Sequence, residues 1–159
     1  MPEDPEPTWL TPAAHRQLQE ELERLTTAGR RRLEERLAEA RSHGDISENA
    51  DYEAAKDEQG LMEARIRRIR HLLKTAEIRA AVSTEVVEIG SLVTVREDGV
   101  ETEYLVATPE NRVPGRQLAS PSGPLGRALL GSRPGDRVDY EAPGGTFTVE
   151  VVAVRPFEA

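Results

Sequence analysis

The stretch NADYEAAKDEQGLMEARIRRIRHLLKTAE, residues 49–77, carries the most regular pattern in the sequence. Mostly apolar residues recur along it in steps of three and four for about four heptads, which is the spacing of a coiled-coil seam. The series consists of Tyr52, Ala55, Gln59, Met62, Ile66, Ile69, Leu73 and Ala76. This pattern predicts a helix from about Asn49 to Glu77 that packs along one face against a partner helix.

The partner helix is predicted upstream, from Pro12 to about Ser42. Thr11 suits its N-cap and Pro12 its first position. Its apolar stripe comes in two blocks, namely Leu18, Leu22 and Leu25, then Leu33, Leu37 and Ala40. Gly29 falls in the gap between the blocks and costs roughly 1 kcal/mol relative to alanine inside a helix, so we expect a bend or a loosened turn near residues 27–30.

The short polar connection between the two helices forces them to run antiparallel, and at about 1.5 Å rise per residue each would be roughly 45 Å long. The connection GDISENADY, residues 44–52, brings acidic side chains to the solvent-facing end of this hairpin. Between residues 45 and 58 there are six acidic residues and one lysine: Asp45, Glu48, Asp51, Glu53, Asp57, Glu58 and Lys56. We therefore predict an acidic tip at residues 44–52.

After about Arg79 the helical period ends and short β-branched or aromatic runs take over. Glycine-containing turns at 98–99, 114–115, 134–135 and 143–145 separate these runs, and one short helix fits Leu125 to Leu130. The predicted fold class is therefore α+β, with an antiparallel coiled-coil helical hairpin followed by a small antiparallel sheet domain with one short helix. The predicted boundaries are a disordered N-terminus at 1–8, the hairpin at 9–79, a linker at 80–84 and the sheet domain at 85–159.

The composition excludes several classes of protein. No apolar run approaches the roughly 20 residues that span a bilayer, so we expect no membrane partner. The net charge of −8 argues against generic binding to duplex DNA, which depends on dense Lys and Arg contacts to phosphate. The absence of cysteine rules out a disulfide framework and a thiolate nucleophile, and it fits a cytoplasmic location.

Asp45 and Glu48 are the candidate chemical groups. Mg²⁺ prefers oxygen ligands and usually takes one or two protein carboxylates, a number that this pair supplies. Two carboxylates are too few to hold a catalytic metal alone, so another protein would have to complete the site. The alternative is a capping box, because an acid followed three residues later by Glu is also typical of a helix N-terminus. Ser47 is a second candidate for the cap, which would free Asp45.

Two stretches resemble the Gre family of bacterial transcript cleavage factors. HGDISENADYEAAKDEQGLMEARI, residues 43–66, is similar to the family's tip and second coiled-coil helix, and PLGRALLG, residues 124–131, is similar to its C-terminal signature. Three positions depart from the family pattern: Arg31 replaces a proline, Glu53 replaces a common histidine, and Gly123 replaces a serine. Neither Asp45 nor Glu48 is affected.

The resemblance implies a transcription elongation factor that enters the secondary channel of bacterial RNA polymerase and stimulates the polymerase's own cleavage of backtracked RNA. Such a factor is not itself an enzyme. It contacts the 3′ end of the nascent RNA, meets DNA only through the polymerase, and has no cofactor of its own. Asp45 and Glu48 would act in trans in the polymerase active site and share Mg²⁺ with it. The C-terminal domain would be FKBP-like and would dock on the polymerase.

The resemblance also suggests supporting residues. They are Ile46, Ser47, Asn49 and Tyr52 for support of the tip, Arg30, Arg31, Arg32, Arg65 and Arg68 facing RNA, and Pro124, Leu125, Gly126 and Arg127 for docking. Each group has a plainer interpretation, since arginines on helices usually pair with acids and Tyr52 lies on the packing seam. The alternative function is a regulator that enters the channel and blocks it without promoting cleavage. A retained prolyl isomerase activity is disfavoured because the second half has few aromatic residues.

Overall fold

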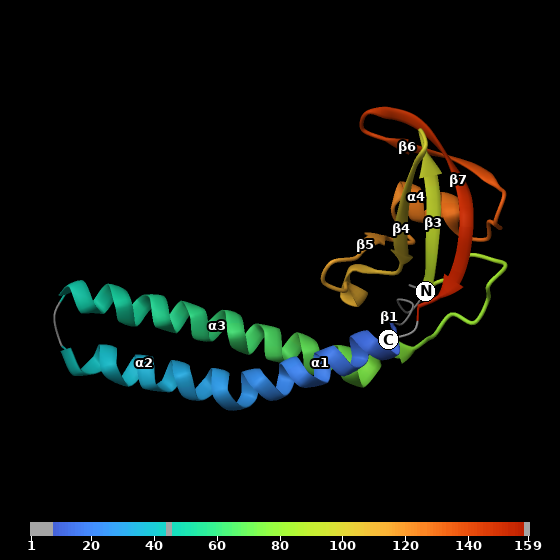
Figure 1. Cartoon of the computed structure of the whole chain (residues 1–159). Coiled ribbons are helices and arrows are strands. Elements are labelled where there is room, and N and C mark those ends of the chain that lie inside the picture. Colours follow the sequence, from blue (N-terminus) through green and yellow to red (C-terminus); the bar gives the residue numbers. More distant parts are fainter. Residues whose placement is uncertain (1–7, 44–45, 158–159) are drawn as a thin grey trace, which may run out of the picture. The chain divides into compact units, whose positions relative to one another are not determined.

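A computed structural model describes residues 8–43 and 46–157 of the chain (Figure 1). The chain divides into two compact units, one formed by Arg16–Ala76 and the other by the described residues of Met1–His15 and Glu77–Ala159. The sequence placed residues 9–15 with the hairpin and residues 80–84 in a separate linker. In the structure both segments belong to the sheet unit.

The first unit contains the helical hairpin predicted from the heptads. Its first arm consists of α1 (Pro12–Arg24, whose first residues belong to the other unit), a π-helical turn η1 (Leu25–Gly29) and α2 (Arg30–His43). Its second arm is the single helix α3 (Ile46–Thr75), which lies beside α2 (Figure 1). The buried side chains of Leu33, Met62 and Ile66 pack together between the arms, so the predicted seam is confirmed at its centre.

The loosened turn expected near Gly29 is the π-helical turn η1. A Cβ atom on Gly29 would lie 3.2 Å from the Met62 sulfur, so the glycine lets α3 approach the gap in the leucine stripe. The hydroxyls of Thr26 and Thr27 donate to the carbonyl oxygens of Leu22 and Glu23, at 2.7 and 2.6 Å. These side-chain hydrogen bonds satisfy carbonyl oxygens at the end of α1, where the π-helical turn changes the regular backbone hydrogen bonding.

The start of the first helix agrees with the sequence, and the start of α3 differs from it. Thr11 Oγ1 accepts a hydrogen bond from the Ala14 amide at 3.1 Å, which is the predicted N-cap. Helix α3 begins at Ile46, about one turn earlier than the predicted start near Asn49. The connection between the arms is correspondingly shorter, and most of the GDISENADY stretch is helical.

The second unit is built on a five-stranded sheet with the order β5-β4-β3-β7-β6. Its strands are β3 (Ser91–Glu97), β4 (Val100–Val106), β5 (Gln117–Ala119), β6 (Arg137–Ala142) and β7 (Gly145–Pro156). Three neighbouring pairs are antiparallel, as predicted, but β5 runs parallel to β4. The parallel pair arises because the chain after β4 passes through the short 3₁₀ helix η2 (Pro109–Asn111) before it returns to the sheet.

A β-bulge in β7 keeps valines on one face of the sheet. Val95 pairs with Val151, but Thr94 pairs with Ala153, so Val152 is an extra residue in β7. Because side chains alternate along a strand, this extra residue places Val154 on the same face as Val151. That face forms the main core with α4 (Pro124–Leu129), whose Leu129 is fully buried.

Residues 8–15 join the sheet unit through a short parallel pair and one buried asparagine. Strand β1 (Trp9–Leu10) pairs with β2 (Glu77–Ile78). The Asn111 side chain is 1% exposed; it accepts from the Thr11 amide at 2.6 Å and donates to the Trp9 carbonyl at 2.8 Å. A buried amide with these partners is costly to unpair, so residues 9–11 are integral to this unit.

Residues 80–84 are likewise held by hydrogen bonds to the sheet unit. The Glu88 carboxylate accepts from the amides of Val82 and Ser83, at 2.6 and 3.1 Å, and these bonds lower its pKa. Ala81 is buried, and a Cβ atom on Gly90 would lie 3.0 Å from its amide nitrogen. Among the described residues, no helix is long and apolar enough to cross a membrane.

Candidate functional site

The acidic tip falls largely on positions whose side chains the structure does not describe. Asp45 lies outside the described residues, and the side chains of Ile46, Ser47, Glu48 and Asn49 do too, although these four residues belong to the backbone of α3. Because α3 begins at Ile46, Ser47 is inside the helix and is not its N-cap. The capping alternative therefore rests on Asp45 alone, and the roles of these residues stay predictions.

Asp51 is the first acidic side chain of the tip that the structure describes, and an arginine of the other arm engages it. Arg36 Nη2 lies 3.2 Å from Asp51 Oδ1, and Arg36 Nη1 is paired with the carboxylate of Glu58. Arg36 thus links α2 to two residues of α3 that lie about two turns apart. Because Asp51 is paired with Arg36, it is a weaker candidate for a metal ligand.

Tyr52 was predicted to support the tip, and the structure shows its partner, Arg41, which the sequence did not indicate. The guanidinium carbon of Arg41 lies 5.5 Å from the centroid of the Tyr52 ring, and Arg41 Nη2 donates to the Tyr52 hydroxyl at 3.2 Å. This hydrogen bond to the guanidinium lowers the pKa of the Tyr52 phenol. The sequence signal for this pair would have been a cationic residue in the last turn of α2.

The five arginines proposed to face RNA do not form one uniform group. Arg30 holds Glu63 through two hydrogen bonds of 2.9 and 3.0 Å, and Arg65 holds Glu21 through two of 2.8 Å. Arg32 lies 3.4 Å from Glu58, and Arg31 and Arg68 are exposed. Arg30, Arg32 and Arg65 therefore join the two arms, and acids of the opposite helix partly neutralise their charges.

We predict that acid destabilises the hairpin. The hydrogen bonds from Arg65 and Arg30 lower the pKa values of Glu21 and Glu63 below the ordinary 4.5. Folding therefore releases protons from these carboxyls, and their stabilisation is complete above about pH 4.5 and is lost as the pH falls through the lowered values. Thermal melts followed by circular dichroism should show a lower melting temperature of the helices at about pH 3 than at about pH 6. The double variant Glu21→Gln/Glu63→Gln should show a weaker dependence of the melting temperature on pH. A melting temperature of the wild-type helices that does not fall over this range would contradict the prediction.

The docking candidates on α4 differ sharply in accessibility. Pro124 and Arg127 are exposed, Leu125 is half-buried against the core, and Gly126 is buried. A Cβ atom on Gly126 would lie 1.8 Å from the Ser120 carbonyl oxygen, so the helix and the 120–121 backbone touch at this glycine. Gly126 therefore cannot present a surface to a partner, and its role is to allow this close approach. A docking role remains a prediction for Pro124, Leu125 and Arg127.

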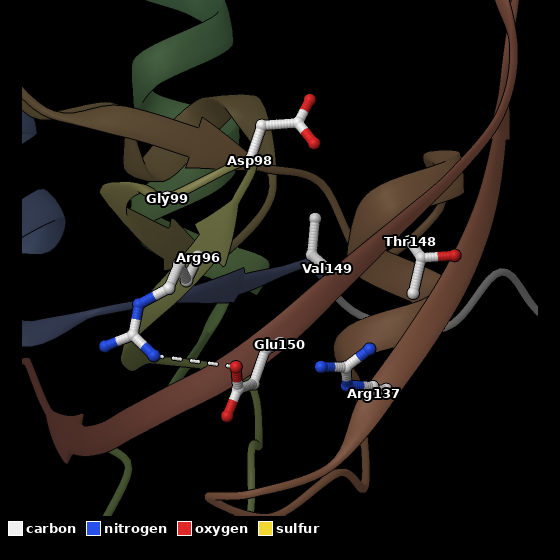
Figure 2. A pocket seen from close by; sticks show the side chains of 7 residues that line it. All are labelled: Arg96, Asp98, Gly99, Arg137, Thr148, Val149 and Glu150. Atoms are coloured by element: carbon white, nitrogen blue, oxygen red, sulfur yellow. Dashed lines mark ion pairs between the residues drawn. The ribbon is translucent and has the colours of Figure 1, made fainter.

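A polar pocket of about 320 Å³ lies around the 98–99 turn, which joins β3 to β4. Figure 2 shows Glu150 between Arg96 and Arg137, which face it from the neighbouring strands in the sheet register. Arg96 lies 3.5 Å from Glu150 and 2.7 Å from Glu101. Because acids already offset the arginine charges, the pocket is not suited to an anionic ligand.

Comparison with known proteins gives matches over both units. Two family models match, "Transcription elongation factor, N-terminal" over residues 8–78 and "Transcription elongation factor, GreA/GreB, C-term" over residues 82–156. The chain is 40% identical over 153 residues to the transcription elongation factor GreA of Chloroflexus aurantiacus, and the match covers 94% of this chain and 98% of that protein. It is 44% identical over 156 residues to GreA of Saccharopolyspora erythraea, covering 94% and 95%. The crystal structure of GreA factor homolog 1 of Thermus thermophilus aligns with a TM-score of 0.40 and 33% identity, covering 94% of this chain and 99% of that one.

Proposed function

Since this chain belongs to the GreA/GreB family of transcription elongation factors, we propose that it acts on bacterial RNA polymerase by inserting its helical hairpin into the secondary channel and stimulating cleavage of backtracked RNA. The polymerase carries out the cleavage, and this chain is an accessory factor without its own catalytic site. Its partners are the polymerase and the 3′ end of the nascent RNA, with DNA reached only through the polymerase.

The observation that carries this proposal is the position of the acidic stretch in the hairpin. Helix α2 ends at His43 and α3 begins at Ile46, so Gly44 and Asp45 connect the two arms. Glu48 belongs to the first turn of α3. A pair of antiparallel helices with acids at their connection can carry carboxylates into a narrow channel ahead of the rest of the protein.

Asp45 and Glu48 are of the residue type that a shared Mg²⁺ site would need. Arg36 engages Asp51, and we assign the ion to Asp45 and Glu48, because one or two protein carboxylates are typical of Mg²⁺ sites. The polymerase would supply further ligands, and the shared ion would stabilise charge on the attacking and leaving oxygens of the RNA phosphodiester. Among the described residues, no three His, Asp or Glu side chains are grouped to hold a metal.

The test of the function is incubation with a stalled, backtracked bacterial transcription complex. We expect shortened RNA and release of a short 3′ fragment, with restart of transcription after nucleotides are added. The full-length chain without polymerase is the control and should leave the same RNA intact. Binding to the polymerase without shortened RNA would instead support the alternative function, a regulator that blocks the channel.

We also predict that Mg²⁺ affinity appears only in the complex. Two carboxylates without further ligands should give the free protein no tight Mg²⁺ site, so calorimetric titration of the free chain should show negligible heat. Adding the chain to a backtracked complex should lower the Mg²⁺ concentration that gives half-maximal cleavage, and Asp45→Asn should raise it again because the amide loses the charge. A tight site in the free chain, or an unchanged Mg²⁺ requirement in the complex, would rule this mechanism out.

A further inference from the structure

Among the side chains that the structure describes, few large aliphatic ones are buried at the end of the hairpin near the tip. The described residues that are buried beyond the Leu33–Met62–Ile66 cluster toward the tip are Leu37, Ala40 and Ala55. Alanine contributes little apolar area, and apolar stabilisation scales with the area buried. Contacts other than aliphatic packing therefore contribute to holding the described first turns of α3 against α2.

Two arginines of α2 supply those contacts at consecutive residues of α3. Arg36 pairs with Asp51 at 3.2 Å, and Arg41 reaches Tyr52, with its guanidinium 5.5 Å from the ring centroid and 3.2 Å from the hydroxyl. Arg36 also pairs with Glu58, so its contacts extend away from the tip. Of the described contacts between the arms, the Arg41–Tyr52 contact lies nearest the connection, with Arg41 two residues before the end of α2.

The chemistry of this contact is specific to arginine. A planar guanidinium can stack on an aromatic face and donate a directed hydrogen bond to the hydroxyl of the same ring, whereas a lysine ammonium provides the charge without the fork. The two interactions act on different parts of Tyr52, so they restrict the rotation of its ring and the separation of the helices. Both side chains are in the described part of the chain.

We propose that Arg41 is a positioning residue for transcript cleavage: through Tyr52 it fixes the first turns of α3, which carry Glu48, against the last turn of α2. This inference rests on the proposed function. A carboxylate that acts in another protein's active site must arrive in a defined place, and a misplacement of about 1 Å can cost about a hundredfold in rate. The Arg41–Tyr52 contact therefore affects the rate of the cleavage step and leaves attachment to the polymerase unchanged.

The first measurement is independent of activity. The natural sequence has no cysteine, so Glu39→Cys and Ala54→Cys, at exposed positions of α2 and α3, give two specific sites for spin labels. Pulsed electron resonance on the labelled full chain reports the distribution of distances between the arms. Arg41→Met should broaden this distribution, and Arg16→Met, the same change at an exposed arginine of α1, should leave it unchanged.

The second measurement separates rate from binding in the backtracked complex. Arg41→Met should lower the maximal cleavage rate about tenfold, with the factor concentration for half-maximal rate changed less than about twofold. Arg41→Lys keeps the charge but loses the planar fork, so it should recover only part of the rate, whereas Tyr52→Leu should match Arg41→Met. The double variant should be no slower than either single one, because both remove the same contact.

The outcomes distinguish this inference from the function on which it rests. A wild-type rate for Arg41→Met, an unchanged distance distribution, or additive losses in the double variant would overturn the positioning role. A higher factor concentration for half-maximal rate, with an unchanged maximal rate, would also overturn the positioning role. That result would show that Arg41 acts in binding to the polymerase. If the wild-type chain shortens no RNA, the proposed function fails and the role in cleavage fails with it; the distance distributions then decide only whether the contact orders the hairpin.

Discussion

Replacing Asp45 or Glu48 with alanine should abolish stimulated cleavage and leave polymerase binding intact. The reason is that each substitution removes a carboxylate from a shared Mg²⁺ site that has few protein ligands to lose. RNA length in a backtracked complex measures cleavage, and competition with the wild-type chain measures binding. This is the largest effect on function that we expect from a single residue, because both acids belong to the segment that joins the arms or to the first turn of α3.

A second substitution separates this role from helix capping. Asn and Asp are about equally good N-cap residues, and removal of a cap costs about 0.5–2 kcal/mol. Asp45→Asn should therefore keep the melting temperature of the hairpin and lose most of the cleavage at the Mg²⁺ concentration that suffices for the wild-type chain. Asp57→Asn, at an exposed position of α3 beyond the tip, is the matched control and should retain both properties. A variant Asp45→Ala with a clearly lower melting temperature and normal cleavage would assign Asp45 to the cap.

The hairpin could be predicted from the sequence because its signals are local and repeated. The heptad positions of α3, the Thr11-Pro12 start and the glycine in the leucine gap each follow from a spacing of a few residues. The partners of the arginines could not be predicted this way. Arg30 and Glu63 are 33 positions apart, and their pairing depends on the register between the arms, which the heptads alone do not define.

The sheet unit shows the same limit in another form. Strands β3, β4, β6 and β7 were visible as β-branched runs separated by glycine turns, whereas β1, β2 and β5 have only two or three residues and no alternation to detect. The contacts that tie residues 9–11 to this unit could not be predicted for a related reason. Asn111 binds the backbone of residues about 100 positions away, and a single polar residue in a loop gives no sequence signal for such a partner.

Gly126→Ala should destabilise the sheet unit by more than about 3 kcal/mol, beyond the usual cost of overpacking, because the new methyl group would meet backbone that cannot rotate away. Its Cβ would lie 1.8 Å from the Ser120 oxygen and 2.5 Å from the Ser120 carbonyl carbon, so α4 would have to move off the core that Leu129 helps to fill. Gly123→Ala is the matched control, since its Cβ would meet the same oxygen at 3.4 Å, an ordinary contact. The single tryptophan, Trp9, belongs to the sheet unit and reports its unfolding in urea by fluorescence. Equal urea midpoints for the two variants would show that the 120–121 loop can move to admit the methyl group. The close approach at Gly126 would then not be required for stability.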